Sequence, residues 1–355
     1  MTVVDAAVVV LGLGIAAYAV LGGADFGAGF WDLVAGGAKG GLRQRALIAD
    51  SIGPVWEANH TWLVFDLVIL WTAFSPAIAA IMTTLIVPIS LVALGMVLRG
   101  AAFAFRPVAT GLRGRQLAGV VFAASSVVTP FFLGAIAGSI ASGRVAADGV
   151  SSDPWSSWLN PTSTLVGVLA VAVCAYLAAV FLVADAHRRG DAELIVAFRR
   201  RAIAAAAAAG AVSFAGIAVI GTDAPLLARE LVARGWPLIA ASGILGTAAL
   251  ALLWRGAPRA TRLLAVGAVL AVLLGWGVAQ YPYVLPPSLT FAAAASPAGA
   301  LDALLIVFVG AALVIAPSLA LLFWLDQRDR LVGHGVGSDA APPAPRGTGD
   351  RGTSS

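Results

Sequence analysis

Acidic side chains occur inside two stretches of sequence that are otherwise apolar enough to cross a membrane. Asp25 lies within residues 22–29 (GGADFGAG), and Glu57 lies within residues 52–63 (IGPVWEANHTWL). Ionisable groups at membrane depth are costly, and they usually face the interior of a helix bundle or a water-filled cavity. These two acids are therefore the first candidates for function.

The glycine-rich sequence around Asp25 is not a phosphate-binding loop, because it lacks the lysine and hydroxyl that such loops carry. Gly23 and Gly27 instead form a GxxxG pattern, which lets helix backbones approach closely. Asp25 lies about ten residues before the end of its apolar stretch, or roughly 15 Å deep at the helical rise. Its carboxylate either pairs with an arginine and pins two helices together, or takes part in proton transfer.

Glu57 and His60 are three residues apart, so they share one face of a predicted helix. An acid and an imidazole, with Asn59 beside them, can carry protons inward from the nearer membrane surface. The alternative is a polar cluster that holds helices together without changing protonation. A metal site is the weaker interpretation, because the other histidines, His187 and His334, lie in a predicted loop and the tail.

Arg99 lies near the end of a third apolar stretch, in the sequence MVLRGAAFAFR. An arginine at this place extends to the membrane surface by default. The sharper hypothesis pairs Arg99 with Asp25 or Glu57, in which case the paired acid stays ionised and is a poor proton carrier. Asp66 returns to nearly the face of Asn59 and is interpreted as a hydrogen-bonded structural acid.

The composition indicates an integral membrane protein. Hydrophobic residues make up 60% of the 355 residues, charged residues 11%, and the mean hydropathy is +0.94. A soluble domain carries roughly a quarter charged residues. Residues 1–5 contain no basic residue, which argues against a cleaved signal peptide. Nine apolar segments are long enough to cross as helices: 6–34, 47–74, 77–98, 117–141, 163–185, 202–221, 237–254, 263–280 and 301–325.

The distribution of basic residues predicts the orientation of these spans. With nine spans, 19 of the 22 lysines and arginines fall on one set of alternate loops and on the tail. The other set holds Arg144, Arg229 and Arg234. The positive-inside rule then places the N-terminus outside and the C-terminus in the cytoplasm. The net charge of +4 therefore reflects topology and does not indicate nucleic-acid binding.

The chain divides into a transmembrane domain over residues 1–331 and a tail over residues 332–355. The tail is rich in Gly, Pro, Ala and Ser without apolar periodicity, which predicts a disordered cytoplasmic segment. Cys174 is the single cysteine, so neither an intrachain disulfide nor a thiolate metal cluster can form.

Three motifs together resemble subunit II of cytochrome bd-type quinol oxidases. They are GADFGAG in the first span, IGPVWEANHTWL at the start of the second and LRGAAFAFR at the end of the third. The resemblance is strong over residues 18–107, and the later sequence YPYVLPPSLT resembles the loop before the last helix of the family. Each motif alone is weak, whereas three in the right order at the right helix ends are specific.

This resemblance implies an all-helical fold of two four-helix bundles plus one peripheral helix. It also implies a haem-free subunit of the bacterial cytoplasmic membrane that scaffolds a partner, subunit I. The partner carries two b-type haems and one haem d, oxidises quinol and reduces O2 to water. Subunit II supplies part of the cytoplasmic proton route, and a structural quinone or lipid and a small single-span subunit are further expected partners.

The family's site residues fall on matching positions of this chain. The acid of its W-[DE]-x-N motif, which is associated with the cytoplasmic proton route, is Glu57 here, where many members have aspartate. Glutamate keeps the carboxylate of aspartate, and its longer side chain places that group farther from the helix backbone. The predicted proton route is Glu57, Asp25 and His60, and the residues that match the structural motifs are Trp56, Asn59, Trp62, Gly27, Gly29 and Arg99.

The residues themselves also predict a subunit without haem or catalytic groups of its own. Haem iron needs an axial ligand, and the candidates within the spans are His60, Met82, Met96 and Cys174, which include no pair of histidines. Two alternatives stand beside the oxidase hypothesis. One is a proton-coupled secondary transporter that uses the same polar residues, although no second inverted half is found. The other is a purely structural membrane subunit without a proton role.

Overall fold

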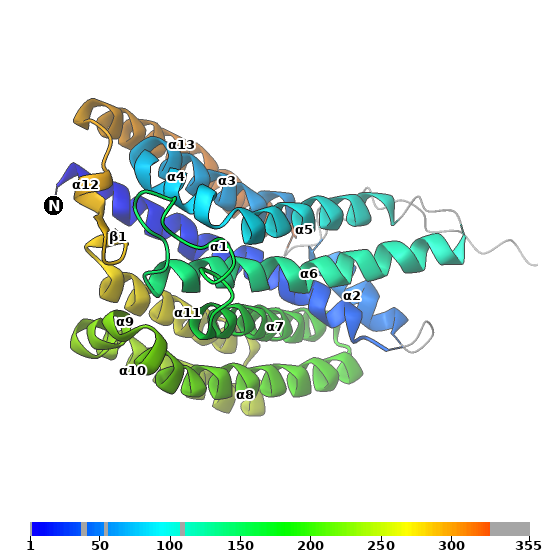
Figure 1. Cartoon of the computed structure of the whole chain (residues 1–355). Coiled ribbons are helices and arrows are strands. Elements are labelled where there is room, and N and C mark those ends of the chain that lie inside the picture. The colour runs from blue at the N-terminus through cyan, green and yellow to red at the C-terminus, as the bar shows by residue number, and fades with distance from the viewer. Residues whose placement is uncertain (1, 37–40, 53–55, 107–110, 327–355) are drawn as a thin grey trace, which may run out of the picture.

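The computed structural model describes residues 2–36, 41–52, 56–106 and 111–326. These residues form helices almost throughout, with one two-stranded antiparallel sheet (Figure 1). The predicted tail over residues 332–355 lies outside the described part of the chain. In chain order the elements are α1 (Val3–Leu33), α2 (Leu42–Ile52), α3 (Trp56–Ala73), α4 (Ser75–Thr84), α5 (Ile86–Phe105), α6 (Leu112–Ala141), α7 (Pro161–Arg189), α8 (Ala192–Asp223), α9 (Pro225–Glu230), the π-helix η1 (Leu231–Gly235), α10 (Trp236–Arg255), α11 (Pro258–Gln280), β1 (Tyr283–Leu285), β2 (Leu289–Thr290), α12 (Phe291–Ala294) and α13 (Ala298–Asp326).

The long helices confirm the predicted polytopic membrane fold. Within the described residues, eight helices are long and apolar enough to cross a membrane, and the bent pair α3–α4 makes a ninth when counted as one span. Helices α1, α3, α5 and α6 form one group, and α7, α8, α10 and α11 form the other (Figure 1). The two groups meet where α7 packs against α1 and α6, and α13 lies at the periphery against α3 and α1.

The predicted boundaries of the second and third spans are wrong. Residues 47–52 belong to α2, a separate short helix, and α3 begins at Trp56. The chain bends by 117° between α3 and α4, where Pro76 opens the first turn of α4, a position that suits proline. The third crossing helix is therefore α5, which begins at Ile86 and continues to Phe105 instead of covering residues 77–98. Arg99 consequently lies more than a turn inside its helix.

Local capping explains where several long helices begin. Asn160 caps α7 by accepting a hydrogen bond from the Ser163 amide at 2.8 Å, and α7 ends at Gly190, whose φ is +67°. Asp191 then caps α8 by accepting from the Leu194 amide at 3.1 Å. This amide, together with the Arg43 guanidinium, lowers the pKa of Asp191. Arg43 comes from α2, so the cap also ties α2 to the start of α8.

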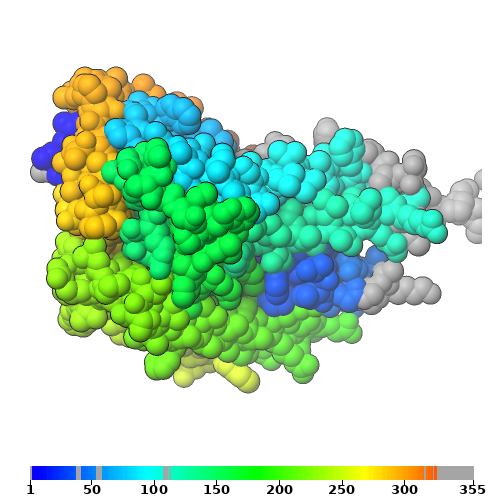
Figure 2. All heavy atoms as spheres, viewed as in Figure 1, coloured from blue at the N-terminus to red at the C-terminus, as the bar shows by residue number. Residues whose placement is uncertain are grey.

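The two ends of the molecule differ in construction. The N-terminus, the β1–β2 hairpin, α9 and α12 lie together at one end, and α2 lies toward the other (Figure 1). Residues 142–160 connect α6 to α7 and lie beside α4 and the hairpin (Figure 2). Gly143 and Gly149 both have positive φ in this connection, and their backbones pack against Pro286 and Ala80. This end of the bundle is therefore covered by irregular, closely packed chain.

A buried polar network between α1, α3, α5 and α6

The carboxyl group of Asp25 lies in the interior of the bundle and is bound from the neighbouring helix. Asp25 is 4% exposed, and Asn59 of α3 donates a hydrogen bond from Nδ2 to its Oδ2 at 2.7 Å. Helices α1 and α3 run antiparallel, with Asn59 beside Asp25 and Asp66 beside Gly14. The Asn59 Oδ1 atom is buried without a hydrogen-bond partner in the described part of the chain.

Arg99 is buried with 2% exposure and does not extend to the membrane surface. Its Nη2 donates to the main-chain oxygen of Asp25 at 3.0 Å, and its Nη1 donates to the Ser126 hydroxyl of α6. The guanidinium also lies over the rings of Phe26 and Phe122, with centroids at 5.0 and 4.6 Å. The default interpretation of a surface-seeking arginine is thus wrong, because α5 continues for six residues beyond Arg99.

The hypothesis that Arg99 forms an ion pair with Asp25 also needs correction. The Arg99 guanidinium donates to the backbone carbonyl of Asp25 and interacts with the Asp25 carboxylate electrostatically, without a direct ion pair among the described residues. The alternative partner, Glu57, has its side chain outside the described part of the chain. Ser126 can accept from Arg99 because its own hydroxyl donates to the Phe122 carbonyl at 2.6 Å. Arg99 therefore fixes helix α1 beside the acid and leaves the carboxyl oxygen to Asn59.

The glycines of the first motif make room for these contacts. A Cβ at Gly29 would overlap the Ser126 side chain and approach Nη1 of Arg99 to 3.1 Å. A Cβ at Gly27 would overlap the carbonyl of Cys174 on α7. At Gly23 an added Cβ would meet the Cys174 sulfur at an ordinary 3.5 Å. The close approach predicted from GxxxG therefore depends on Gly27, and Gly29 serves the polar network.

His60 directly follows Asn59 and lies in an aromatic cluster beside the site. Its ring packs edge-on against Tyr18 and Phe26, with centroids 6.1 and 5.7 Å apart. Trp62 follows on the same helix, and its Nε1 atom is buried without a partner among the described residues. The backbones of Trp56 and Glu57 belong to α3, whereas their side chains lie outside the part of the structure that is described.

A second buried acid, Asp32, was not predicted as a site residue. It lies two helical turns beyond Asp25 on α1, is almost fully buried, and pairs with Arg45 at 3.3 Å and Arg106 at 3.0 Å. Both arginines belong to the basic residues that the sequence predicts on one side of the membrane. Their place on the same predicted side as the end of α1 was the signal that could have pointed to Asp32. Asp32 thus joins α1, α2 and α5 near the end of the molecule that holds α2.

Asp66 lies on α3 in the other half of the bundle and differs from its predicted state. It faces Gly14 of α1, where any side chain would overlap its carboxyl group. Its Oδ1 atom is buried without a hydrogen-bond partner among the described residues, as is the Tyr18 hydroxyl. The predicted role of a hydrogen-bonded structural acid is therefore not supported at this oxygen.

Two of the residues considered as haem or metal ligands, His60 and Cys174, pack against aromatic side chains. The described part of the chain contains no group of three His, Cys, Asp or Glu side chains placed to hold a metal ion. The Cys174 side chain is buried in a cluster with Tyr18 and Phe26. With the residues described, the site can hold a buried carboxyl group against one amide donor, Asn59 of α3, while Arg99 of α5 binds the backbone carbonyl of the same residue.

Comparisons with known proteins agree with this architecture. The family described as Cytochrome bd terminal oxidase subunit II matches residues 4–326. The chain is 31% identical over 155 residues to Cytochrome bd ubiquinol oxidase subunit 2 of Bacillus subtilis (strain 168). That alignment covers 43% of this chain and 45% of the relative, so it spans less than half the length of either protein.

A solved structure has the same fold over nearly the whole chain. It is a chain of the bd oxidase from Geobacillus thermodenitrificans, with a TM-score of 0.78 and 24% identity. The similarity covers 94% of this chain and 100% of that chain. At this level of identity, the likeness establishes the arrangement of the helices.

Proposed function

Because the chain belongs to the cytochrome bd terminal oxidase subunit II family, we propose that it is the haem-free second subunit of a quinol oxidase that reduces O2 to water. In this proposal a partner subunit carries two b-type haems and one haem d and oxidises the quinol. The present chain scaffolds that partner in the bacterial cytoplasmic membrane. A small single-span subunit and a structural quinone or lipid complete the proposed assembly.

Two of the four candidate haem ligands in the described part of the chain are surrounded by other side chains. An axial ligand must reach the iron with an unobstructed nitrogen or sulfur. His60 is flanked by two aromatic rings, and Cys174 lies in an apolar cluster. This packing supports a division in which redox chemistry takes place in the partner.

The observation that carries the proposed proton role is the state of Asp25. Its carboxyl group is buried at membrane depth and accepts a hydrogen bond from the neutral amide of Asn59, while the nearby Arg99 guanidinium interacts with it electrostatically without a direct ion pair in the described part of the chain. A carboxyl group without a paired cation can gain and lose a proton more readily than one locked in a salt bridge. We therefore assign Asp25, with Glu57 and His60, to the cytoplasmic proton route.

The proposed orientation places the end with α2 in the cytoplasm. Arginines of the predicted basic set lie there, as the positive-inside rule requires: Arg43 and Arg45 of α2, Arg106 at the end of α5 and Arg189 at the end of α7. Asp32 and its partners Arg45 and Arg106 then lie between the cytoplasm and Asp25. Protons entering at this end would reach Asp25 after passing the Asp32 cluster.

Substitution of the two proposed carriers tests this function. We expect Glu57→Gln and Asp25→Asn to slow quinol-driven oxygen consumption by about a hundredfold, the size of a typical proton-transfer contribution, while the haem absorption spectra stay unchanged. Glu193→Gln is the matched control, because Glu193 is an exposed acid at the start of α8. Unchanged oxygen consumption and spectra in both variants would refute the proton role. Purification of a colourless, active single chain would refute the oxidase assignment.

A further inference from the structure

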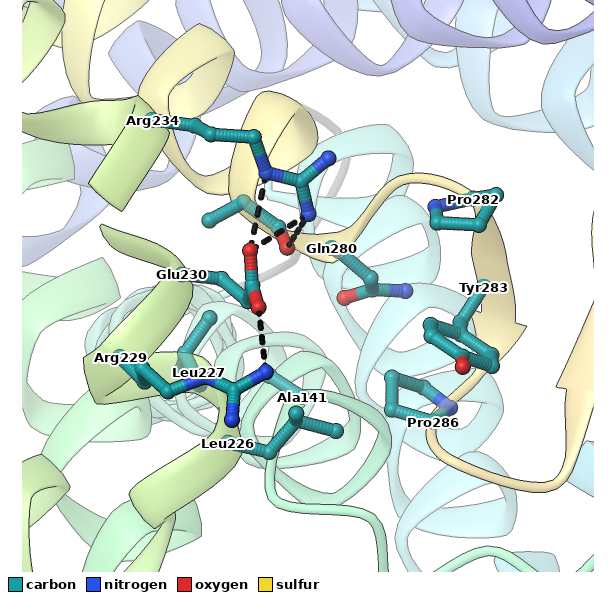
Figure 3. Close-up of a pocket in the computed structure, with 11 residues that line it drawn as sticks. Ala141, Leu226, Leu227, Arg229, Glu230, Arg234, Gln280, Pro282, Tyr283 and Pro286 are labelled. Atoms are coloured by element: carbon teal, nitrogen blue, oxygen red, sulfur yellow. Dashed lines mark hydrogen bonds and ion pairs between the residues drawn. The ribbon is translucent and has the colours of Figure 1, made fainter. Parts of the chain in front are cut away.

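A cavity of about 180 Å³ lies at the end of the molecule that holds the hairpin, away from the Asp25 network. This volume is far above the roughly 15 Å³ that one water requires. The end of α6, α9, η1, the end of α11 and the hairpin surround it (Figure 3). Its charged and polar lining consists of Arg229, Glu230, Arg234, Gln280 and Tyr283.

The charges at this cavity do not balance. Glu230 accepts from Arg229 at 3.2 Å and from Nε of Arg234 at 2.9 Å, so one carboxylate faces two guanidinium groups. The two arginine side chains are 77% and 42% exposed, which leaves several N–H donors directed away from Glu230. Figure 3 shows these three side chains on one wall of the cavity and Tyr283 on the opposite wall.

This concentration of positive charge is unusual for its end of the molecule. The sequence places three basic residues on this side, and the third, Arg144, is neutralised by Asp223 through two hydrogen bonds of 3.0 and 2.6 Å. The remaining two both line the cavity. A side with only three predicted basic residues therefore places two of them together at one cavity.

The backbone at the cavity has a π-helical turn. The element η1 follows Glu230 directly and contains Arg234. Such turns are rare and occur frequently at functional sites. Gly235 closes the turn against α11, where an added Cβ would lie 3.0 Å from the Gly275 carbonyl oxygen. The turn thus fixes Arg234 beside Glu230 at the rim of the cavity.

An apolar strip leads away from the arginines. Val232, Trp236 and Ile239 follow Arg229 at intervals of three or four residues, and all three are exposed on the surface of the helix. Tyr281, near the cavity, is also exposed. Tryptophan and tyrosine favour the interface between lipid headgroups and acyl chains, so the cavity lies where a headgroup would meet the membrane core.

We propose that this cavity binds one anionic glycerophospholipid, with the phosphate at Arg229 and Arg234 and an acyl chain along the Val232–Trp236–Ile239 strip. Guanidinium groups bind phosphate through paired, charge-assisted hydrogen bonds. A single negative charge matches the excess of one guanidinium over the Glu230 carboxylate. The continuous apolar strip favours a lipid over a free phosphate ion, because only a lipid would cover it. The site requires no part of the proposed proton route.

Counting the phospholipids that stay with the protein tests this site. The protein is purified with its subunits from the native membrane in mild detergent and analysed by native mass spectrometry. We expect the double variant Arg229→Gln/Arg234→Gln to retain one phospholipid fewer than the wild type. Arg259→Gln is the matched control, because Arg259 is an exposed arginine at the opposite end of α11. An intact complex with an unchanged lipid count in the double variant would overturn the proposal.

Binding of added ligand distinguishes the lipid from a free anion. Dioctanoyl phosphatidylglycerol should raise the melting temperature of the delipidated protein, and its affinity should fall roughly tenfold in the double variant, about the effect of losing one hydrogen bond to a charged group. Glu230→Gln removes the competing carboxylate, so it should bind this lipid more tightly than the wild type. An equal response to inorganic phosphate, or weaker lipid binding in Glu230→Gln, would contradict the assigned ligand.

Discussion

At the scale of single residues, Arg99 illustrates how burial changes the role of a charged side chain. The sequence places it near the end of an apolar stretch, where contact with the membrane surface is the usual outcome. In the structure its guanidinium binds the Asp25 carbonyl and the Ser126 hydroxyl, and it lies over two phenylalanine rings. The residue therefore joins α5 to α1 and α6 and sets the position of the Asp25 helix turn.

We expect Arg99→Met to destabilise the complex by roughly 1–3 kcal/mol for each buried hydrogen-bond partner left unpaired. The reason is that methionine fills much of the space but cannot donate to the Asp25 carbonyl or to Ser126. Thermal unfolding of the purified complex measures the effect as a lower melting temperature. Arg113→Gln is the control, because Arg113 is exposed on α6. A melting temperature of Arg99→Met equal to that of the control would show that the buried contacts contribute little.

At the scale of elements, the close contact between α1 and α7 depends on Gly27, and not equally on both glycines of the GxxxG pattern. Gly27 lies directly against the Cys174 carbonyl, whereas Gly23 has room for a methyl group. Both positions belong to the same GxxxG sequence and lie one helical turn apart on the same helix. Close helix packing in membranes is favoured by small residues at such positions.

This difference in available space predicts different changes in stability for two matched variants. Gly27→Ala should destabilise the protein by about 1–3 kcal/mol, the usual cost of overpacking a tight interface. Gly23→Ala should be close to neutral, because its added methyl group would meet the Cys174 sulfur and a Leu177 methyl group at ordinary van der Waals distances. Melting temperatures of the two variants, measured in the same detergent, provide the comparison. Equal losses in both would indicate that the helices are spaced differently from the structure.

At the scale of the whole molecule, the two ends are held together by different means. Toward the end with α2, ion pairs join elements far apart in the sequence, such as Asp32 with Arg45 and Arg106. The other end combines one such ion pair, Arg144 with Asp223, with hydrogen bonds from irregular chain, where the Ser296 amide donates to the Ala73 carbonyl at 2.9 Å and the Tyr281 hydroxyl donates to Asp5 at 3.0 Å. This asymmetry agrees with the proposed orientation, in which the basic end faces the cytoplasm.

Labelling of introduced cysteines tests that orientation. In a Cys174→Ala background, we expect an impermeant maleimide to label Val150→Cys in right-side-out membrane vesicles and to spare Glu193→Cys. Val150 is 82% exposed between α6 and α7, and Glu193 is exposed at the start of α8, toward the opposite end. Both variants should react after the vesicles are opened with detergent. The reverse pattern before opening would overturn the proposed orientation.

The sequence alone determined the class of the molecule, most of its spans and its family. Apolar length and the side on which basic residues lie are properties of each segment by itself, so they can be read without knowing what the segment contacts. This explains why α1, α6, α7, α8, α11 and α13 lie where the apolar stretches predicted them. The motif around Asp25 and the motif around Asn59 could also be recognised, because the residues of each motif follow one another closely in the chain.

Only the tertiary structure decided where the helices bend and which groups meet. The bend of 117° between α3 and α4 interrupts sequence that is apolar on both sides, so hydropathy carries no sign of it. The separate α2 includes Arg43, Arg45 and Asp50, but its last residues, 47–52, were apolar enough to be joined to the predicted second span. The contact of Arg99 with the Asp25 carbonyl and the pairing of Asp32 with Arg106 each join residues 74 positions apart. Such contacts depend on how helices pack across the bundle, and this packing is set by side-chain shape and glycine spacing in three dimensions.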